Sequence, residues 1–337
     1  MRLSELGEFG LIDLIHSAGS RYETPRRSPW REVLVGIGDD AAAWQNGSQI
    51  QLATTDTMVQ SVHFNLSVIT WEELGRKALA VNLSDIAAMG GIPKYALLSL
   101  ALPAQLEAED VSKFIDSMMR LAAEFEVAVV GGNVAVASNV VITVTIIGSA
   151  KGRDLLRRST ASPGQQLAVT GYLGSSAAGL EVLEGKTISD AKASSLLRRS
   201  HLDPTPRVKE GQILIEQGVR TAIDISDGLL ADLGHICEAS NVGAKVKLEQ
   251  VPIHPVVMAN FPNHDDLALS GGEDYELLFT AEEAIVDRVR QALDCPVTVI
   301  GNITDGPHPT PVMLVDRDGS TVAYKKGGWN HFKNGVH

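Results

Sequence analysis

The spacing of hydrophobic residues changes repeatedly along the chain, and these changes predict an alternation of strands and helices. Short apolar runs bounded by turn residues predict strands, whereas apolar positions three and four apart predict helices. In the first half we predict strands at 33–44, 50–59, 95–103, 127–133 and 140–150, and helices at 3–18, 70–94 and 105–126. In the second half we predict strands at 166–171, 221–224, 275–280 and 297–304, helices at 175–184, 189–199, 207–217 and 228–239, and a hairpin at 312–325.

The helix predicted at 70–94 has marked ends and one residue that does not suit its face. Thr70 and Glu73 form a capping box, and Gly90 marks the stop. Its inward face is an apolar stripe of Leu74, Ala78 and Val81. Asp85 follows at the same spacing, so its carboxylate returns to the inward face. There it needs a salt bridge, a hydrogen bond at the helix end or a metal ion.

A change of composition divides the chain into two parts. Residues 151–166 are basic and then rich in turn residues, and strands alternate with helices on both sides of this segment. We therefore predict an α/β protein with two domains, 1–150 and 151–337. A length of 337 residues also favours two domains.

Composition and charge exclude several classes of protein. The formal net charge of -12 argues against nucleic acid or an anionic membrane as the main partner. Only two cysteines are present, Cys237 and Cys295, so neither a disulfide framework nor a zinc site is expected. The first residues lack the basic-then-apolar order of a signal peptide, and no apolar run is long enough to cross a bilayer. We expect a cytoplasmic protein.

Acids and hydroxyls recur where the predicted strands end. "GDD" supplies Asp39 and Asp40, "TTDT" supplies Asp56 with two threonines, and "DISD" supplies Asp224 and Asp227. Each group alone is typical of a turn or a helix cap. Together with Asp85, they are the hard oxygen ligands that suit magnesium. Two carboxylates ~4 Å apart repel by roughly 4 kcal/mol near a protein surface, so converging acids favour bound cations. Magnesium and a polyphosphate would satisfy such a site.

Other common site chemistries find less support in the sequence. There is no G-x-x-x-x-G-K-[ST] motif, no G-x-G-x-x-G after a strand and no nucleophile elbow. The turn "TGYLGSSAAGL" at 170–180 either holds an anion at a helix start or serves tight packing.

Six motifs occur in the order found in thiamine-monophosphate kinases, and the chain resembles that family from about residue 6 to "GGWNHF". They are "GIGDDAA", "TTDTMVQSVHF", "KALAVNLSDIAAMGG", "RRSTASPGQ", "DISDGLLADLGH" and "SGGEDYELLFT". The resemblance implies the two-domain fold of the aminoimidazole ribonucleotide synthetase superfamily, with an N-terminal mixed sheet that forms the interface of a homodimer. It also implies ATP-dependent phosphorylation of thiamine monophosphate to thiamine diphosphate, with several Mg²⁺ ions.

The resemblance also implies roles for individual residues. The implied metal ligands are Asp40, Thr54, Thr55, Asp56, Asp85, Asn133, Asp224 and Asp227. The implied ATP contacts are Gly132, Asn133, Arg158 and Ser226. The implied contacts with thiamine monophosphate are His63, Glu273 and Trp329. An ordinary turn for Glu273, a satisfied structural histidine for His63 and a core anchor for Trp329 are the alternatives.

One motif departs from the family. The chain has "GGNVAVAS" at 131–138 where the family often has "GGDT" followed by arginine. Asn133 therefore replaces an acid, which predicts a modified site with weaker metal binding or fewer ions.

The implied reaction is direct in-line phosphoryl transfer, in which cations offset the repulsion between two anions. We assign no general base and no covalent nucleophile. The alternatives are another ATP-using member of the superfamily and a nucleotide-binding dimer without turnover.

Overall fold

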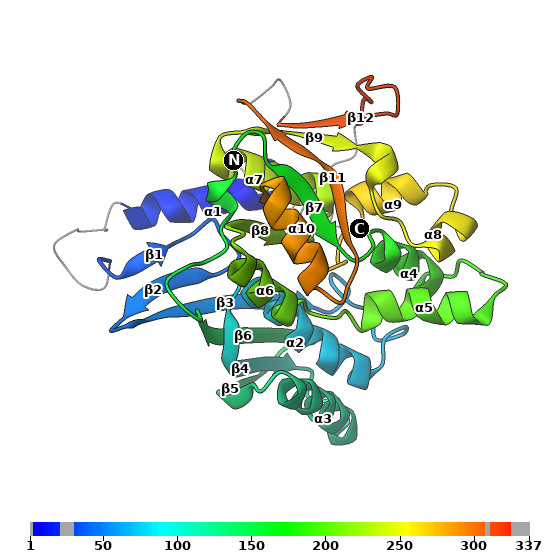
Figure 1. The fold of residues 1–337 in the computed structure, drawn as a ribbon. Helices are drawn as coiled ribbons and strands as arrows, with labels where there is room; N and C mark the ends of the chain where they lie inside the picture. Colours follow the sequence, from blue (N-terminus) through cyan, green and yellow to red (C-terminus); the bar gives the residue numbers. More distant parts are fainter. Residues whose placement is uncertain (1–2, 21–29, 307–310, 325–337) are drawn as a thin grey trace.

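The computed structural model describes residues 3–20, 30–306 and 311–324, whose strands form two six-stranded sheets (Figure 1). The first sheet has the order β1-β2-β3-β6-β4-β5 and the second has the order β12-β9-β11-β7-β10-β8. Each sheet is built from one half of the chain. This arrangement agrees with the predicted α/β class.

The elements alternate along the chain as the periodicity predicts. The first half contains α1 (Leu3–Ser20), β1 (Val33–Val35), β2 (Ala42–Asn46), β3 (Gln49–Val59), α2 (Trp71–Ala88), β4 (Ile92–Leu102), α3 (Ala108–Glu124), β5 (Ala128–Val136) and β6 (Val141–Ser149). The second half contains η1 (Arg158–Thr160), β7 (Gln166–Thr170), α4 (Ser175–Leu183), α5 (Ala191–Leu202), α6 (Val208–Gln217), β8 (Thr221–Asp224), α7 (Leu229–Ser240), β9 (Gly243–Lys247), η2 (Leu248–Gln250), α8 (Pro255–Asn260), α9 (His264–Ser270), β10 (Leu277–Ala281), α10 (Glu283–Ala292), β11 (Val297–Thr304) and β12 (Val312–Val315).

Two predicted strands differ in ways that matter for the site. The strand predicted at 33–44 is broken into β1 and β2, so "GDD" lies in the turn between them. Gly38, with a φ of +117°, belongs to that break. "TTDT" lies inside β3 and not at its end as predicted, because β3 pairs with β6 without interruption from Gln51 to Val59. The predicted hairpin keeps its turn, but β12 pairs in parallel with β9.

Helix α2 connects the two halves. Its capping box is present, since Thr70 accepts a hydrogen bond from the Glu73 backbone and the Glu73 carboxylate accepts one from Thr70 N. It covers one face of the first sheet and also packs against α6 and β8 of the second half (Figure 1). Gly75 allows α3 to approach, because a Cβ there would lie 2.2 Å from the Phe114 carbonyl oxygen.

The hydrophobic core of the first half continues into the second sheet. Alternate residues of β10 belong to different clusters: Leu277 and Phe279 join the core that includes α2, whereas Leu278 packs with Leu233 of α7. One shared core thus holds the two halves together and fixes the residues that meet between them.

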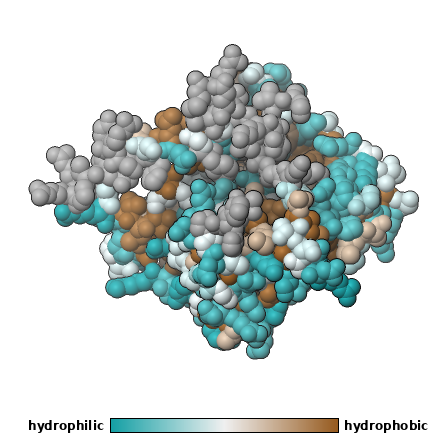
Figure 2. Space-filling view, turned by 90° about the horizontal axis from the view of Figure 1, so that it is seen from above, coloured by the Kyte–Doolittle hydropathy of each residue, from teal (hydrophilic) through white to brown (hydrophobic). Residues whose placement is uncertain are grey.

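The surface is mostly hydrophilic on the face seen in Figure 2, with hydrophobic residues in smaller patches. Within the described ranges, no helix combines the length and the apolar character that a bilayer crossing requires.

Candidate active site

A cavity of about 2160 Å³ is lined by residues from both halves of the chain. Its lining includes acids and hydroxyls, Glu273, and apolar residues of the 64–69 segment and of α4. The predicted acids Asp40, Asp56, Asp85 and Asp224 all line this cavity. The tertiary structure therefore brings together most of the residues that the sequence singled out.

Three carboxylates from three separate elements converge in the cavity. Asp40 lies in the turn before β2, Asp85 on α2 and Asp224 at the end of β8, and their nearest oxygens all lie within 4.8 Å of one another. Thr54 Oγ1 donates to Asp85 Oδ2 at 2.6 Å, and Ser84 Oγ donates to Asp224 Oδ2 at 2.6 Å. The inward placement of Asp85 is as predicted, and the hydroxyls orient the acids.

Arg158 lies beside this cluster and offsets part of its charge. Its guanidinium forms a hydrogen-bonded ion pair with Asp40 Oδ1, and its backbone N–H donates to Asp39 Oδ2 at 3.3 Å. Burial disfavours the charged arginine, but the contacts with Asp40 and Asp39 raise its pKa. Asp40 Oδ2 is buried and has no hydrogen-bond partner among the described residues. An orphaned, buried carboxylate oxygen next to two further acids fits a divalent cation.

The acids are strongly perturbed by burial and by one another. Burial, with repulsion from Asp40, raises the pKa of Asp224 to about 8. Burial also raises the pKa of Asp85 well above its usual range, reinforced by Asp56 and Asp224. Asp39 is raised to a pKa of about 7, mainly by burial. Near neutral pH the cluster therefore favours either bound protons or bound cations.

Strand alternation separates the members of "TTDT". Thr54 and Asp56 face α2, where Asp56 N donates to Asn82 Oδ1 at 2.9 Å. Thr55 points to the opposite face of the sheet, where its Oγ1 lies 2.9 Å from Thr145 Oγ1. The sequence pattern alone did not distinguish these two directions.

The "GGN" segment lies on β5, and β6 and β4 separate it from β3. Asn133 pairs with Ser99 of β4, and Ser99 pairs in turn with Thr143 of β6. Side chains of paired residues share a face of the sheet, so Asn133 lies on the same face as Thr55, and it is exposed. Gly132 is held in close contact with β4, because a Cβ there would lie 1.6 Å from the Leu98 carbonyl oxygen. Tight strand packing accounts for this glycine.

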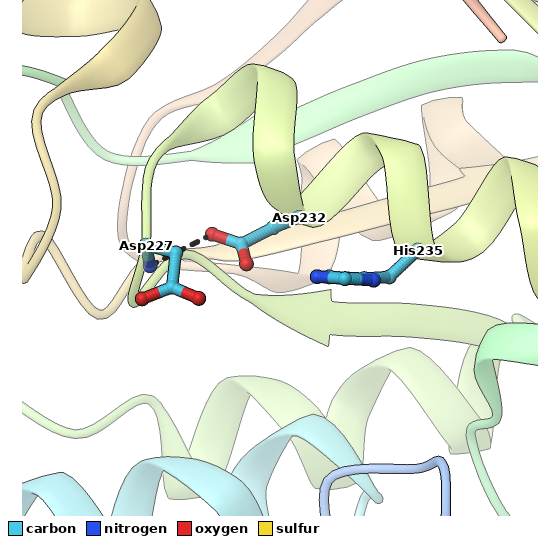
Figure 3. Close-up of side chains that lie close together, drawn as sticks. All are labelled: Asp227, Asp232 and His235. Carbon is cyan, nitrogen blue, oxygen red and sulfur yellow. Dashed lines mark hydrogen bonds between the residues drawn. The ribbon is translucent and has the colours of Figure 1, made fainter. Parts of the chain in front are cut away.

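The "DISD" loop is held in place by a residue that the sequence analysis missed. Asp232 of α7 accepts three backbone hydrogen bonds through Oδ2, from Ser226 at 3.1 Å, Asp227 at 3.1 Å and Gly228 at 3.0 Å. Asp227, Asp232 and His235 lie together beside the first turns of α7 (Figure 3). Asp232 thus shapes the loop that carries Ser226 and Asp227. The sequence feature that could have identified Asp232 is its position four residues after Gly228, which precedes α7.

Each acid of "GGEDYE" contacts a different element. Glu273 Oε2 accepts from Lys77 Nζ of α2 at 3.1 Å. Asp274 accepts from Gly174 N at 2.7 Å and from Ser176 N at 3.1 Å, at the start of α4. Glu276 is paired with Arg207. The glycine-rich turn at 170–180 therefore binds an anion of the protein itself, namely the Asp274 carboxylate.

His63 and Trp329 complete the set of predicted substrate contacts. His63 lines the cavity, its Nδ1 accepts from Val59 N at 2.9 Å, and it lies close enough to Glu273 to help lower the pKa of that acid. Trp329 lies outside the described residues.

Lys77 is the second functional candidate that the sequence analysis missed. It lies three residues after Leu74 and eight before Asp85, on the same inward stripe of α2, so the charge pattern that identified Asp85 would also have found it.

Comparisons with known proteins identify the family that the chain resembles. Residues 38–150 match the AIR synthase related protein, N-terminal domain, and residues 162–313 match the corresponding C-terminal domain. Thiamine-monophosphate kinase of Bacillus subtilis is 38% identical over 330 residues, covering 96% of this chain and 99% of the relative. The Escherichia coli K12 enzyme is 39% identical, covering 97% and 98%.

Solved structures of the same family have a similar fold. The structure of AaThiL complexed with AMPPCP and TMP has a TM-score of 0.84 and 36% identity, covering 98% of this chain and 99% of that one. Thiamine monophosphate kinase from Aquifex aeolicus has a TM-score of 0.79 and 34% identity, covering 96% and 99%. With a two-domain match, near-complete coverage and the acid cluster in place, the chain belongs to the thiamine-monophosphate kinase family.

Proposed function

We propose that the chain transfers the γ-phosphate of ATP directly to thiamine monophosphate and so forms thiamine diphosphate. The observation that carries this proposal is the convergence of Asp40, Asp85 and Asp224 beside Arg158 in one cavity. Two anionic reactants repel each other, and a cluster that attracts cations next to a guanidinium is suited to bringing them together.

The proposed metal ligands in the cavity are Asp40, Thr54, Asp56, Asp85, Asp224 and Asp227. Carboxylate and hydroxyl oxygens suit Mg²⁺, and several ions would balance the charge of this wall. When bound, magnesium supplies positive charge that neutralises the phosphates of both reactants. Thr55 and Asn133 also remain proposed ligands, although they face the other side of the sheet in the single chain.

The chain's own side chains position the reactants in this proposal. The Arg158 guanidinium is a fork that matches phosphate oxygens, and Ser226 lies on the loop that Asp232 holds. With Gly132 and Asn133 they are the proposed ATP contacts. Glu273 and His63 are proposed to contact thiamine monophosphate from the cavity wall, with Trp329 as a third contact.

The reaction needs no general base from the protein. The terminal phosphate of thiamine monophosphate is already largely deprotonated near neutral pH, so its oxygen can attack directly. No side chain is proposed to carry a phosphoryl group. Catalysis then rests on neutralisation and orientation.

Product formation tests the proposal. Purified chain is incubated with ATP, Mg²⁺ and thiamine monophosphate, and thiamine diphosphate is measured by chromatography. We expect product with the unmodified chain, none without Mg²⁺, and a loss of at least about 100-fold in Asp85→Asn. Asp116→Asn, an exposed acid of α3, is the matched control and should retain full activity. Absence of product with the unmodified chain would refute the proposed activity.

We also propose a homodimer formed through the first sheet. The face of β4 turned away from α2 exposes Tyr95 by 48% and Leu97 by 37%. A neighbouring copy that covered these residues would bury apolar surface. Leu97→Asp should give a monomer in light scattering, whereas Met258→Asp, at an exposed position on α8, should leave the mass unchanged.

Two further proposals concern organisation and location. A domain boundary at residue 150 is supported by the two family segments, which end and begin on either side of it. A cytoplasmic location is proposed because ATP is the phosphate donor.

A further inference from the structure

A buried charge on α2, that of Lys77, lines the cavity and has no role in the proposed phosphoryl transfer. The Lys77 side chain is only 1% exposed, and its ammonium lies 3.1 Å from Glu273 Oε2 and 3.3 Å from His201 Nε2. Removing an ammonium from water is strongly unfavourable unless it is paired. Its presence inside α2 therefore calls for a specific partner, and Glu273 is that partner.

The contacts determine which groups in this network are charged. An ammonium only donates hydrogen bonds, so His201 Nε2 must accept and the ring proton lies on Nδ1. Nδ1 is 3.0 Å from Ser176 Oγ and 3.3 Å from Glu273 Oε2. Burial and Lys77 lower the pKa of His201 to about 4, whereas Lys77 and His201 lower the pKa of Glu273 although burial works against its charge. A neutral histidine thus lies between an ammonium and a carboxylate.

Both donors approach the same oxygen of Glu273. Lys77 Nζ and His201 Nδ1 lie near Oε2, and within the described part of the chain no hydrogen bond to Oε1 is present. The side chain is 30% exposed and lines the cavity. Lys77 and His201 therefore hold Glu273 Oε2, whereas Oε1 is available to a ligand.

The backbone at Glu273 is also held in an unusual conformation. Its φ is +65°, which is uncommon for a residue with a side chain. Its N–H donates to the Ser226 carbonyl at 2.8 Å, and the next residue, Asp274, is bound by the start of α4. Strain of this kind persists where the surroundings determine the conformation, and it is common at ligand-binding sites.

We propose that Lys77 is a positioning residue that holds Glu273 Oε2 so that Oε1 selects a ligand ring bearing a positive charge or an N–H donor. Phe64, Val68 and Leu180 line the same cavity and provide an apolar wall for such a ring. This inference rests on the proposed function, since the thiamine part of the substrate offers both a cationic thiazolium and an aminopyrimidine. Lys77 would act on recognition of the acceptor and leave ATP binding unaffected.

A double-mutant cycle tests the coupling. Lys77→Met, Glu273→Gln and the double variant are compared by the KM for thiamine monophosphate and the KM for ATP. We expect each single substitution to raise the first KM by about tenfold or more, because a charge-assisted hydrogen bond is lost or misdirected. The KM for ATP should stay within about twofold. The KM of the double variant for thiamine monophosphate should not exceed the higher KM of the two single variants, because Lys77 acts only through Glu273.

Stability provides a second readout. Lys77→Met leaves the partly buried Glu273 carboxylate without its ammonium partner and should lower the unfolding temperature, whereas the double variant should recover it. If Lys77→Met does not fold, Glu273→Gln and the double variant are compared directly, and equal KM values are expected. Lys113→Met, which removes a half-exposed lysine of α3, is the control for loss of a lysine and should change neither KM.

Two outcomes would overturn the assignment of Lys77. One is additive effects of the two substitutions on the KM for thiamine monophosphate, and the other is an equal rise in the KM for ATP. The unmodified chain separates this result from the wider proposal. If it forms thiamine diphosphate but the cycle is additive, the role of Lys77 is wrong and the activity stands.

Discussion

Replacing Asp224 with asparagine should stabilise the metal-free protein while abolishing its activity. Asp224 is 3% exposed, and it lies within a cluster that includes Asp40 and Asp85. Asparagine has nearly the same shape, can still accept from Ser84 Oγ, and can donate to a neighbouring carboxylate. The substitution therefore puts a permanently neutral group where the folded chain must otherwise hold a protonated carboxyl or a buried negative charge, and it leaves no cavity.

The size of the effect follows from the pKa. Asp224 ordinarily titrates at 3.8 and is raised to about 8 in the fold. Between these values the folded chain keeps a proton that the unfolded chain releases, so stability falls as the pH rises through this window. A pH of 7 lies about 3 units above the ordinary pKa of Asp224, which corresponds to a loss of at most about 4 kcal/mol in the free energy of unfolding. For a chain of 337 residues this is about 6 °C in unfolding temperature.

Calorimetry in EDTA between pH 5 and pH 8 measures this effect. We expect the unmodified chain to lose stability toward pH 8 relative to Asp224→Asn, with the largest gap at pH 8. Added Mg²⁺ should stabilise the unmodified chain more at pH 8 than at pH 6, because cations and protons compete for the same acids. Asp116→Asn should follow the unmodified chain. If Asp224→Asn unfolds at a lower temperature than the unmodified chain at pH 8 without metal, the reasoning from buried repulsion is wrong.

Three further predictions concern residues around this cluster. Asp232→Ala leaves three backbone N–H groups of the "DISD" loop without their acceptor, so urea denaturation should show a loss of about 3 kcal/mol; an unchanged midpoint would contradict this role. Arg158→Met should raise the KM for ATP about tenfold or more in steady-state kinetics and leave the KM for thiamine monophosphate nearly unchanged, and the reverse pattern would exclude the assignment. Asn133→Asp should lower the Mg²⁺ concentration for half-maximal activity in a metal titration, and no shift would remove Asn133 from the metal site.

Local signals were sufficient for most of the elements that carry the site. The capping box at Thr70 and Glu73 and the apolar stripe of α2 depend on residues three to eleven apart, so the sequence alone predicted the helix and the inward direction of Asp85. The shortest α-helices in the described part of the chain, α8 with six residues and α9 with seven, were missed because few turns leave little periodicity to detect. Helix α10 was missed although it is amphipathic and ten residues long.

The tertiary structure decided which residues belong to the site. The sequence determined that hydroxyls and acids occur in "TTDT", but only the pairing of β3 with β6 and the position of α2 decided that Thr54 and Asp56 face Asp85 while Thr55 faces away. Likewise, Lys77 and Glu273 are 196 residues apart, and no local pattern links them. The physical reason is that helix caps and apolar periods act between near neighbours, whereas ion pairs and converging acids depend on where packing places distant segments.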